Sequence, residues 1–175
     1  IEYDAAIYNS NGLDIAALMA HKKETGSVRD FPGGENVDRH DAMFLPCDVL
    51  LPAATENVIT SANADRLRCR ILCEGANGPT SLEGDEILAE RGIPVLPDIL
   101  TNAGGVAVSF FEWVQDIQRL FWGPDEIRSR LADLMGDALS RVWDLSESEA
   151  LPFRRAALVT SIREVAEALE ARGIH

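Results

Sequence analysis

Between residues 48 and 97, short apolar runs alternate with segments of helical pattern, and this alternation constrains the fold more than any other feature. The apolar runs cover 48–53, 70–74 and 93–97, and they have the length and character of strands buried on both faces. Helices are predicted between them, over about 60–67 and over 80–92. Strands and helices that alternate with short connections predict a parallel sheet with right-handed crossovers.

The flanking regions differ from this central part. Before it, the pattern predicts a helix over about 13–25, a surface loop over 26–38 and a short helical turn over about 39–44. After residue 105 the pattern is helical throughout, with breaks at Pro124 and Pro152. We therefore expect an α/β part over residues 1–104, followed by an all-helical C-terminal segment over 105–175.

The last predicted helix, which Gly173 ends, carries one apolar stripe that we expect to face a core. Its members are Ala156, Val159, Ile162, Val165, Ala166 and Leu169. Trp113 and Trp122, on the helical segments before it, are interpreted as core aromatic residues.

Composition excludes several classes of function. The chain has 175 residues, of which 46% are apolar and 26% charged, which suits one globular domain and argues against disorder. Its formal net charge of −13 argues against nucleic-acid binding and against an anionic membrane surface. No apolar run is long enough to span a bilayer. The three cysteines form no disulfide framework and are interpreted as reduced thiols of a cytoplasmic protein.

Three loops follow the carboxyl ends of the three predicted strands, where open α/β sheets bind ligands. They cover 52–57, 74–80 and 97–106, and all are rich in small residues. Each loop also contains one amide side chain that can donate and accept: Asn57, Asn77 and Asn102. One such loop is typical of a structural turn. Three at successive strand ends favour a site for a nucleotide-like or polar ligand, and the residues alone leave both readings open.

No residue pattern predicts a catalytic group or a metal site. The glycine spacing of a dinucleotide phosphate loop, G-x-G-x-x-G, does not occur. The histidines, His21, His40 and His175, are scattered and are interpreted as solvent-exposed. Ser109 lies one helical turn beyond Gly105, so its hydroxyl could face the same cleft as Asn102.

Several motifs, taken in order, resemble one family. They are Tyr8-Asn9-Ser10-Asn11-Gly12-Leu13-Asp14, Leu51-Pro52-Ala53-Ala54, Glu74-Gly75-Ala76-Asn77-Gly78-Pro79-Thr80, the run 97–106, and Ser109-Phe110-Phe111-Glu112-Trp113. Together they resemble the C-terminal, cofactor-binding domain of glutamate dehydrogenase over about residues 7–173. The 74–80 loop and the run from Asn102 to Trp113 favour the glutamate enzymes over the leucine, valine and phenylalanine dehydrogenases.

The resemblance implies a Rossmann-like parallel sheet and a nicotinamide cofactor, NAD or NADP. Residues 1–175 would form a partial dinucleotide-binding domain, whose first strand and glycine loop precede Ile1. Ala53, Ala54 and Thr55 would line the adenosine and pyrophosphate side of the cofactor site. Asn77 would contact the cofactor near the nicotinamide ribose, and Asn102 would hold the nicotinamide end.

The resemblance also implies substrate contacts. Val106 and Ser109 would face the substrate, and Ser109 would hydrogen-bond the side-chain carboxylate of glutamate. Glu2 falls near the acidic position that ends the second strand, which mildly favours NAD over NADP because a carboxylate repels a 2′-phosphate.

The family reaction converts L-glutamate to 2-oxoglutarate and ammonia by hydride transfer. Its lysine and carboxylate for proton transfer lie on an N-terminal substrate domain that this chain does not match, so we assign no catalytic residue here. We expect no turnover and weak dinucleotide binding from the chain by itself. The parent enzyme would be a homo-hexamer, and the chain alone could self-associate through an uncovered sheet edge. The alternative is a non-catalytic nucleotide-binding or interaction module with the same fold.

Overall fold

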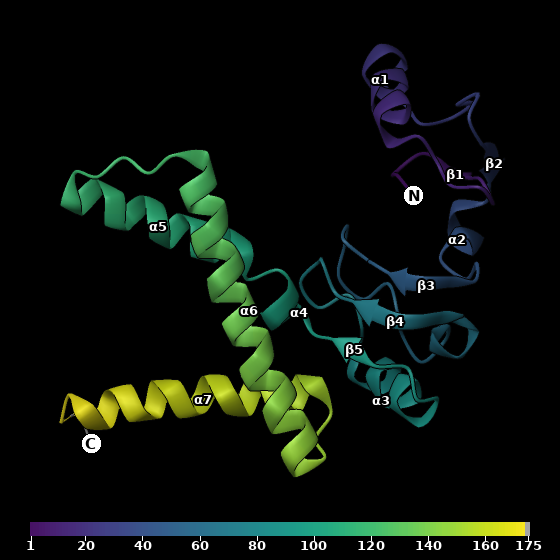
Figure 1. Cartoon of the computed structure of the whole chain (residues 1–175). Coiled ribbons are helices and arrows are strands. Elements are labelled where there is room, and N and C mark those ends of the chain that lie inside the picture. The colour runs from purple at the N-terminus through teal and green to yellow at the C-terminus, as the bar shows by residue number, and fades with distance from the viewer. Residues whose placement is uncertain (174–175) are drawn as a thin grey trace. The chain divides into compact units, whose positions relative to one another are not determined.

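The computed structural model describes residues 1–173 (Figure 1). His175, predicted to be solvent-exposed, lies outside the described residues. The chain divides into two compact units, one made of residues 1–48 and 66–69 and the other of residues 49–65 and those from 70 onward. Each unit is described by itself.

The first unit is built on an antiparallel pair of short strands. β1 (Ala6–Tyr8) pairs with β2 (Glu35–Val37), and Ala6 lies opposite Val37. The helix α1 (Ile15–Thr25) lies between them in the chain, and α2 (Arg39–Ala42) follows β2. The predicted surface loop over 26–38 is therefore wrong at β2. The strand has no apolar alternation of its own, and only its pairing with β1 across α1 makes it a strand.

A three-stranded sheet, most of whose residues belong to the second unit, has the order β3 (Cys47–Leu50), β4 (Cys69–Cys73), β5 (Val95–Leu96). β4 and β5 are parallel, with Leu72 opposite Val95. The helix α3 (Leu82–Glu90) connects them, so the predicted order of strand, helix and strand is confirmed for this half of the sheet. The expectation of burial on both faces is wrong for some strand residues, since Val49 is 55% exposed and Ile71 is 37% exposed.

The segment 60–67 forms only the single 3₁₀ turn η1 (Ala64–Arg66), and the predicted helix is wrong. The Asn63 side chain accepts a hydrogen bond from the Thr60 N–H at 2.8 Å and donates to the Val58 carbonyl at 2.9 Å. These local bonds give the backbone an alternative to the helical pattern.

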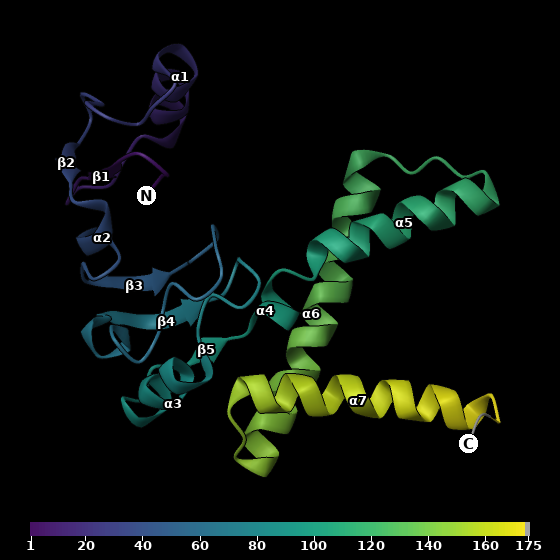
Figure 2. The same ribbon diagram turned by 180° about the vertical axis from the view of Figure 1, so that it is seen from behind.

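After β5 the described chain is helical, as expected. α4 (Asp98–Thr101), α5 (Gly104–Gln118), α6 (Pro124–Glu149) and α7 (Phe153–Ala171) follow in order. The loop predicted over 97–106 is wrong at the one-turn helix α4. The sequence did not indicate this helix, because a single turn is too short to show periodicity. Both views of the chain show α6 crossing α7 beside their connection (Figure 2).

Leu100, Val142, Ala156 and Ala157 are buried together and join α4, α6 and α7 in a small core. Trp113 and much of the α7 stripe lie outside that core. Trp113 is 58% exposed, so its interpretation as a core aromatic residue is wrong. Ile162 is 66% exposed, so the stripe is present on α7 but its expected burial is not. Within residues 1–173, none of the helices combines the length and apolar character that crossing a membrane requires.

Candidate functional site

The loops that follow β3 and β4 are tied together by backbone hydrogen bonds. The N–H groups of Gly75 and Ala76 both donate to the Pro52 carbonyl, at 3.0 and 2.9 Å. A Cβ atom added at Gly75 would lie 3.0 Å from the Cβ of Ala53, which is tighter than ordinary side-chain contact. Glycine at position 75 therefore permits the close approach of the two loops.

Asn77 and Asn102, which the sequence predicts to contact one ligand, contact each other. The Asn102 side-chain amide donates to Asn77 Oδ1 at 2.7 Å and to the Gly75 carbonyl at 3.4 Å. Asn77 is exposed and Asn102 is half-buried, so a ligand can reach this pair from solvent. The loop after β5 thus meets the loop after β4 at the predicted residues.

A buried carboxylate lies beneath these loops. Glu74, the first residue after β4, has no exposed surface. Its Oε1 accepts from Arg154 Nη2 at 2.8 Å, and its Oε2 accepts from the Asp98 N–H at 2.9 Å. Asp98 in turn accepts from the Gly78 N–H at 2.8 Å through Oδ2. These bonds link the 74–80 loop to α4.

Arg154, in the first turn of α7, contacts three carboxylates. Besides Glu74, its Nε donates to Asp85 at 3.1 Å and its Nη1 to Asp98 at 3.5 Å, while only 19% of its side chain is exposed. Burial by itself lowers the pKa of the Arg154 guanidinium, but the hydrogen bonds to Glu74 and Asp85 outweigh it and raise the pKa above its ordinary value. Arg154 is therefore a permanent cation among carboxylates.

The sequence reasoning assigned no role to Glu74, Asp98 or Arg154. One signal was available: a glutamate that directly follows an apolar buried strand needs a cationic or hydrogen-bonding partner. The partner itself was not visible, because Arg154 lies 80 positions further along the chain.

The other predicted site residues are exposed. Ala53, Ala54 and Thr55 lie on the loop after β3, and all three are exposed. Val106, in the first turn of α5, is 77% exposed. Ser109 is also exposed, and its hydroxyl donates to the carbonyl of Gly105, one turn earlier in the same helix, at 3.2 Å.

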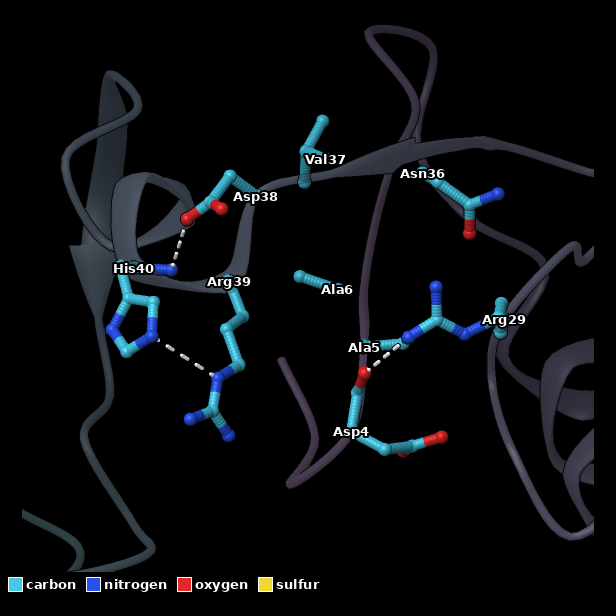
Figure 3. Close-up of a pocket in the computed structure, with 9 residues that line it drawn as sticks. All are labelled: Asp4, Ala5, Ala6, Arg29, Asn36, Val37, Asp38, Arg39 and His40. Atoms are coloured by element: carbon cyan, nitrogen blue, oxygen red, sulfur yellow. Dashed lines mark hydrogen bonds between the residues drawn. The ribbon is translucent and has the colours of Figure 1, made fainter.

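A second polar feature belongs to the first unit. A hollow of about 460 Å³ is lined by Asp4, Arg29, Asp38, Arg39, His40 and neighbouring residues (Figure 3). Arg29 donates to the Asp4 carbonyl at 2.7 Å, and Arg39 Nε donates to the His40 ring at 3.3 Å. Arg29 therefore binds the backbone of the N-terminal segment, and Arg39 also donates to the Tyr3 carbonyl of that segment. The two arginines beside the hollow therefore help to hold that segment in place.

Glu2, expected to influence the choice of cofactor, also lies in the first unit. Its carboxylate forms an exposed ion pair with Lys22 at 2.5 Å. Among residues 1–173, no group of three or more His, Cys, Asp or Glu side chains is arranged to hold a metal ion.

The strand-end loops of the second unit are the arrangement best suited to a ligand. They present small side chains at Ala53 and Ala54, which allow a flat molecule to approach the backbone, and two adjoining amides that can donate and accept. This arrangement offers hydrogen-bond donors and acceptors of the kind that a polar ligand needs.

Comparisons with known proteins identify the family. The chain matches the family described as Glutamate/Leucine/Phenylalanine/Valine dehydrogenase over residues 1–173. It is 46% identical over 169 residues to "Glutamate dehydrogenase" of Thermotoga maritima, an alignment that covers 97% of this chain and 41% of that protein. It is 44% identical over 168 residues to "NAD-specific glutamate dehydrogenase" of Clostridioides difficile, covering 96% of this chain and 40% of the relative.

Solved structures agree with these relatives. The structure of hetero-hexameric glutamate dehydrogenase from Thermus thermophilus, in its Leu-bound form, superimposes with a TM-score of 0.86 at 29% identity. The alignment covers 96% of this chain and 39% of that chain. The chain therefore spans about two fifths of the length of the proteins it matches. These matches do not favour the alternative of a non-catalytic module.

Proposed function

This chain belongs to the Glutamate/Leucine/Phenylalanine/Valine dehydrogenase family, and we propose that it forms the cofactor-binding part of a glutamate dehydrogenase. The complete protein would convert L-glutamate to 2-oxoglutarate and ammonia with a nicotinamide cofactor. The observation that carries the proposal is the contact between Asn77 and Asn102. It unites the two motifs that favour the glutamate enzymes, in a chain whose curated relatives bear that name.

The donor set of the loops fits a nicotinamide dinucleotide. Ala53, Ala54 and Thr55 would pack along the adenosine and pyrophosphate side, where small side chains permit close approach. Asn77 would hydrogen-bond near the nicotinamide ribose, and Asn102 would hold the nicotinamide carboxamide, an amide that needs both a donor and an acceptor. Hydride acceptance and return is the chemistry that a bound nicotinamide supplies.

The substrate side would begin on α5. Val106 would limit the space beside the nicotinamide end, and Ser109 would exchange its bond to the Gly105 carbonyl for one to the glutamate side-chain carboxylate. In this proposal, the chain binds and orients, and no residue of it transfers a proton.

We propose NAD as the cofactor, which the acidic residue Glu2 favours by its place in the sequence relative to the family motifs. The C. difficile relative is named NAD-specific, which agrees with this choice. The complete protein is proposed to be a homo-hexamer, although the similar T. thermophilus enzyme is named hetero-hexameric. A cytoplasmic location is proposed because the odd number of cysteines and their spacing fit reduced thiols better than a disulfide framework.

The decisive experiment measures nicotinamide reduction by the complete protein that carries this chain. We expect reduction of NAD with L-glutamate, and much slower reduction with L-leucine, L-valine or L-phenylalanine. Asn102→Ala should raise the KM for NAD, whereas Asn63→Ala, at an asparagine outside the strand-end loops, should leave it near the wild-type value. A wild-type protein that prefers another amino acid would overturn the substrate, and one that binds no dinucleotide would overturn the whole proposal.

A further inference from the structure

We infer that Arg154 is a positioning residue for the proposed cofactor site, acting through Glu74 and Asp98. The inference rests on the proposed function, because it concerns the geometry of Asn77 and Asn102. Arg154 is on α7, outside the loops that present those asparagines, and no sequence motif links it to them.

Both carboxylates use one oxygen for Arg154 and the other for the backbone of a loop. Glu74 binds Arg154 through Oε1 and the Asp98 N–H through Oε2. Asp98 contacts Arg154 through Oδ1 at 3.5 Å, and the same oxygen accepts from the Ile99 N–H at 2.8 Å. Its Oδ2 accepts from the Gly78 N–H at 2.8 Å. The planar guanidinium, whose donors have fixed directions, therefore orients Glu74 and, together with the Ile99 N–H, Asp98, so that the second oxygen of each carboxylate meets a backbone amide.

Asp98 hydrogen-bonds the backbone at or beside both asparagines. Gly78, which it binds, directly follows Asn77 in the chain. The Asp98 carbonyl accepts a hydrogen bond from the N–H of Asn102, the residue that ends α4, at 3.0 Å. A displacement of Asp98 therefore moves the two residues whose side chains meet at 2.7 Å.

Electrostatics make Arg154 necessary for this arrangement. Glu74, Asp85 and Asp98 all contact the one guanidinium. Without that cation, three carboxylates would remain as neighbours in a largely buried place and would repel one another. Asp98 and Asp85, each 23% exposed at the side chain, can turn toward solvent, whereas Glu74 is fully buried. We therefore expect Asp98 to move first, and the two loops with it.

The test compares variants of the complete protein in direct titrations with NAD. Arg154→Met removes the charge and keeps most of the length of the side chain, and Arg154→Lys keeps the charge without the fork. The matched control is Arg155→Met, at the next position of α7, where the arginine is exposed. We expect the dissociation constant for NAD to rise about tenfold or more in Arg154→Met, by less in Arg154→Lys, and by less than about twofold in Arg155→Met.

A purely structural role for Arg154 predicts a different result. It would lower the fraction of protein that binds, but the folded fraction would bind NAD with the wild-type dissociation constant. The titration is therefore run with the binding stoichiometry measured for each variant. A wild-type dissociation constant in Arg154→Met overturns the inference and leaves the proposed function standing, while a wild-type protein that binds no dinucleotide refutes both.

Asp98→Asn keeps the test decisive if Arg154→Met does not fold. It preserves the bond between Arg154 and Glu74, so it leaves no buried charge unpaired. In the native chain, Asp98 accepts from the Gly78 N–H through Oδ2 and from the Ile99 N–H through Oδ1. The asparagine amide has only one oxygen for these two N–H groups. We expect weakened NAD binding with normal folding, and an unchanged dissociation constant would overturn the inference.

Discussion

Replacing Arg154 should destabilise the folded chain strongly, and the loss should depend on Glu74. The side chain of Glu74 has no exposed surface, that of Arg154 is 19% exposed, and Nη2 lies 2.8 Å from Oε1. Arg154→Met therefore leaves a fully buried carboxylate without its cation. Removing one partner of such a pair lowers the free energy of unfolding by about 3–5 kcal/mol.

The double variant Glu74→Gln with Arg154→Met separates charge burial from lost packing. The glutamine oxygen can still accept from the Asp98 N–H, and the remaining penalty is a new, buried amide N–H₂ donor at the position that Arg154 leaves, about 1–3 kcal/mol. We therefore expect the double variant to be more stable than Arg154→Met alone, even though it carries one more substitution.

Urea unfolding of wild type, both single variants and the double variant measures this dependence, provided that the transition is two-state. The double-mutant cycle should show a coupling of about 2 kcal/mol or more between the two positions, since groups in direct contact are not additive. Additive losses, or a loss below about 1 kcal/mol in Arg154→Met, would refute the view that the pair is tightly buried and interdependent.

Three further predictions follow from single contacts. Gly75→Ala should lower the free energy of unfolding by about 1–3 kcal/mol, because the added Cβ would lie too close to Ala53. The control Gly136→Ala has open space for its Cβ, so it should be neutral or stabilising by up to about 1 kcal/mol. Equal effects of the two variants in urea unfolding would contradict the argument. Ser81→Ala should cost about 1 kcal/mol in the same assay, because Ser81 Oγ accepts from the Gly84 N–H at the start of α3, and an unchanged midpoint would argue against that cap. Burial raises the pKa of the Cys73 thiol, so less thiolate is present at about pH 8. Alkylation of Cys73 by iodoacetamide, followed by peptide mass spectrometry, should therefore be slower in the folded chain than in the urea-unfolded chain. Equal rates would count against burial.

The parts of the fold that the sequence predicted correctly are those with strong signals in neighbouring residues, such as apolar runs and prolines. The three apolar runs became β3, β4 and β5, and Pro124 and Pro152 marked the starts of α6 and α7. A run of apolar residues or a proline acts on its immediate neighbours, so one sequence is enough to detect it. The strand β2 was missed because its only signal is the partner β1, which lies on the far side of α1.

The same distinction applies to burial. Periodicity correctly groups Ile162 and Val165 on one stripe of α7, but both are more than half exposed. A stripe states which residues share a face of a helix, and it contains no information about what covers that face. The prediction that Trp113 on α5 is buried was wrong for the same reason, because an apolar side chain alone does not determine which residues cover it.

The sequence predicted the exposed residues of the candidate site, but not the buried ion pair that lies beneath them. Asn77 and Asn102 were found because loops at the ends of parallel strands converge, and their 2.7 Å contact follows from that topology. The cation beneath them comes from α7, and no spacing rule connects residues 74 and 154.

The motif Glu74–Thr80 is best understood as both architecture and binding surface. Glu74 is fully buried and binds Arg154, while Gly75 permits the contact with Ala53 and Gly78 donates to Asp98. Only Asn77, among these, offers an exposed side-chain amide to a ligand. Because the remaining residues hold the loop in place, substitutions at positions 74, 75 and 78 should weaken binding without removing any atom that touches the ligand. In the proposed site, most of the motif therefore serves to hold one exposed asparagine, Asn77, in place.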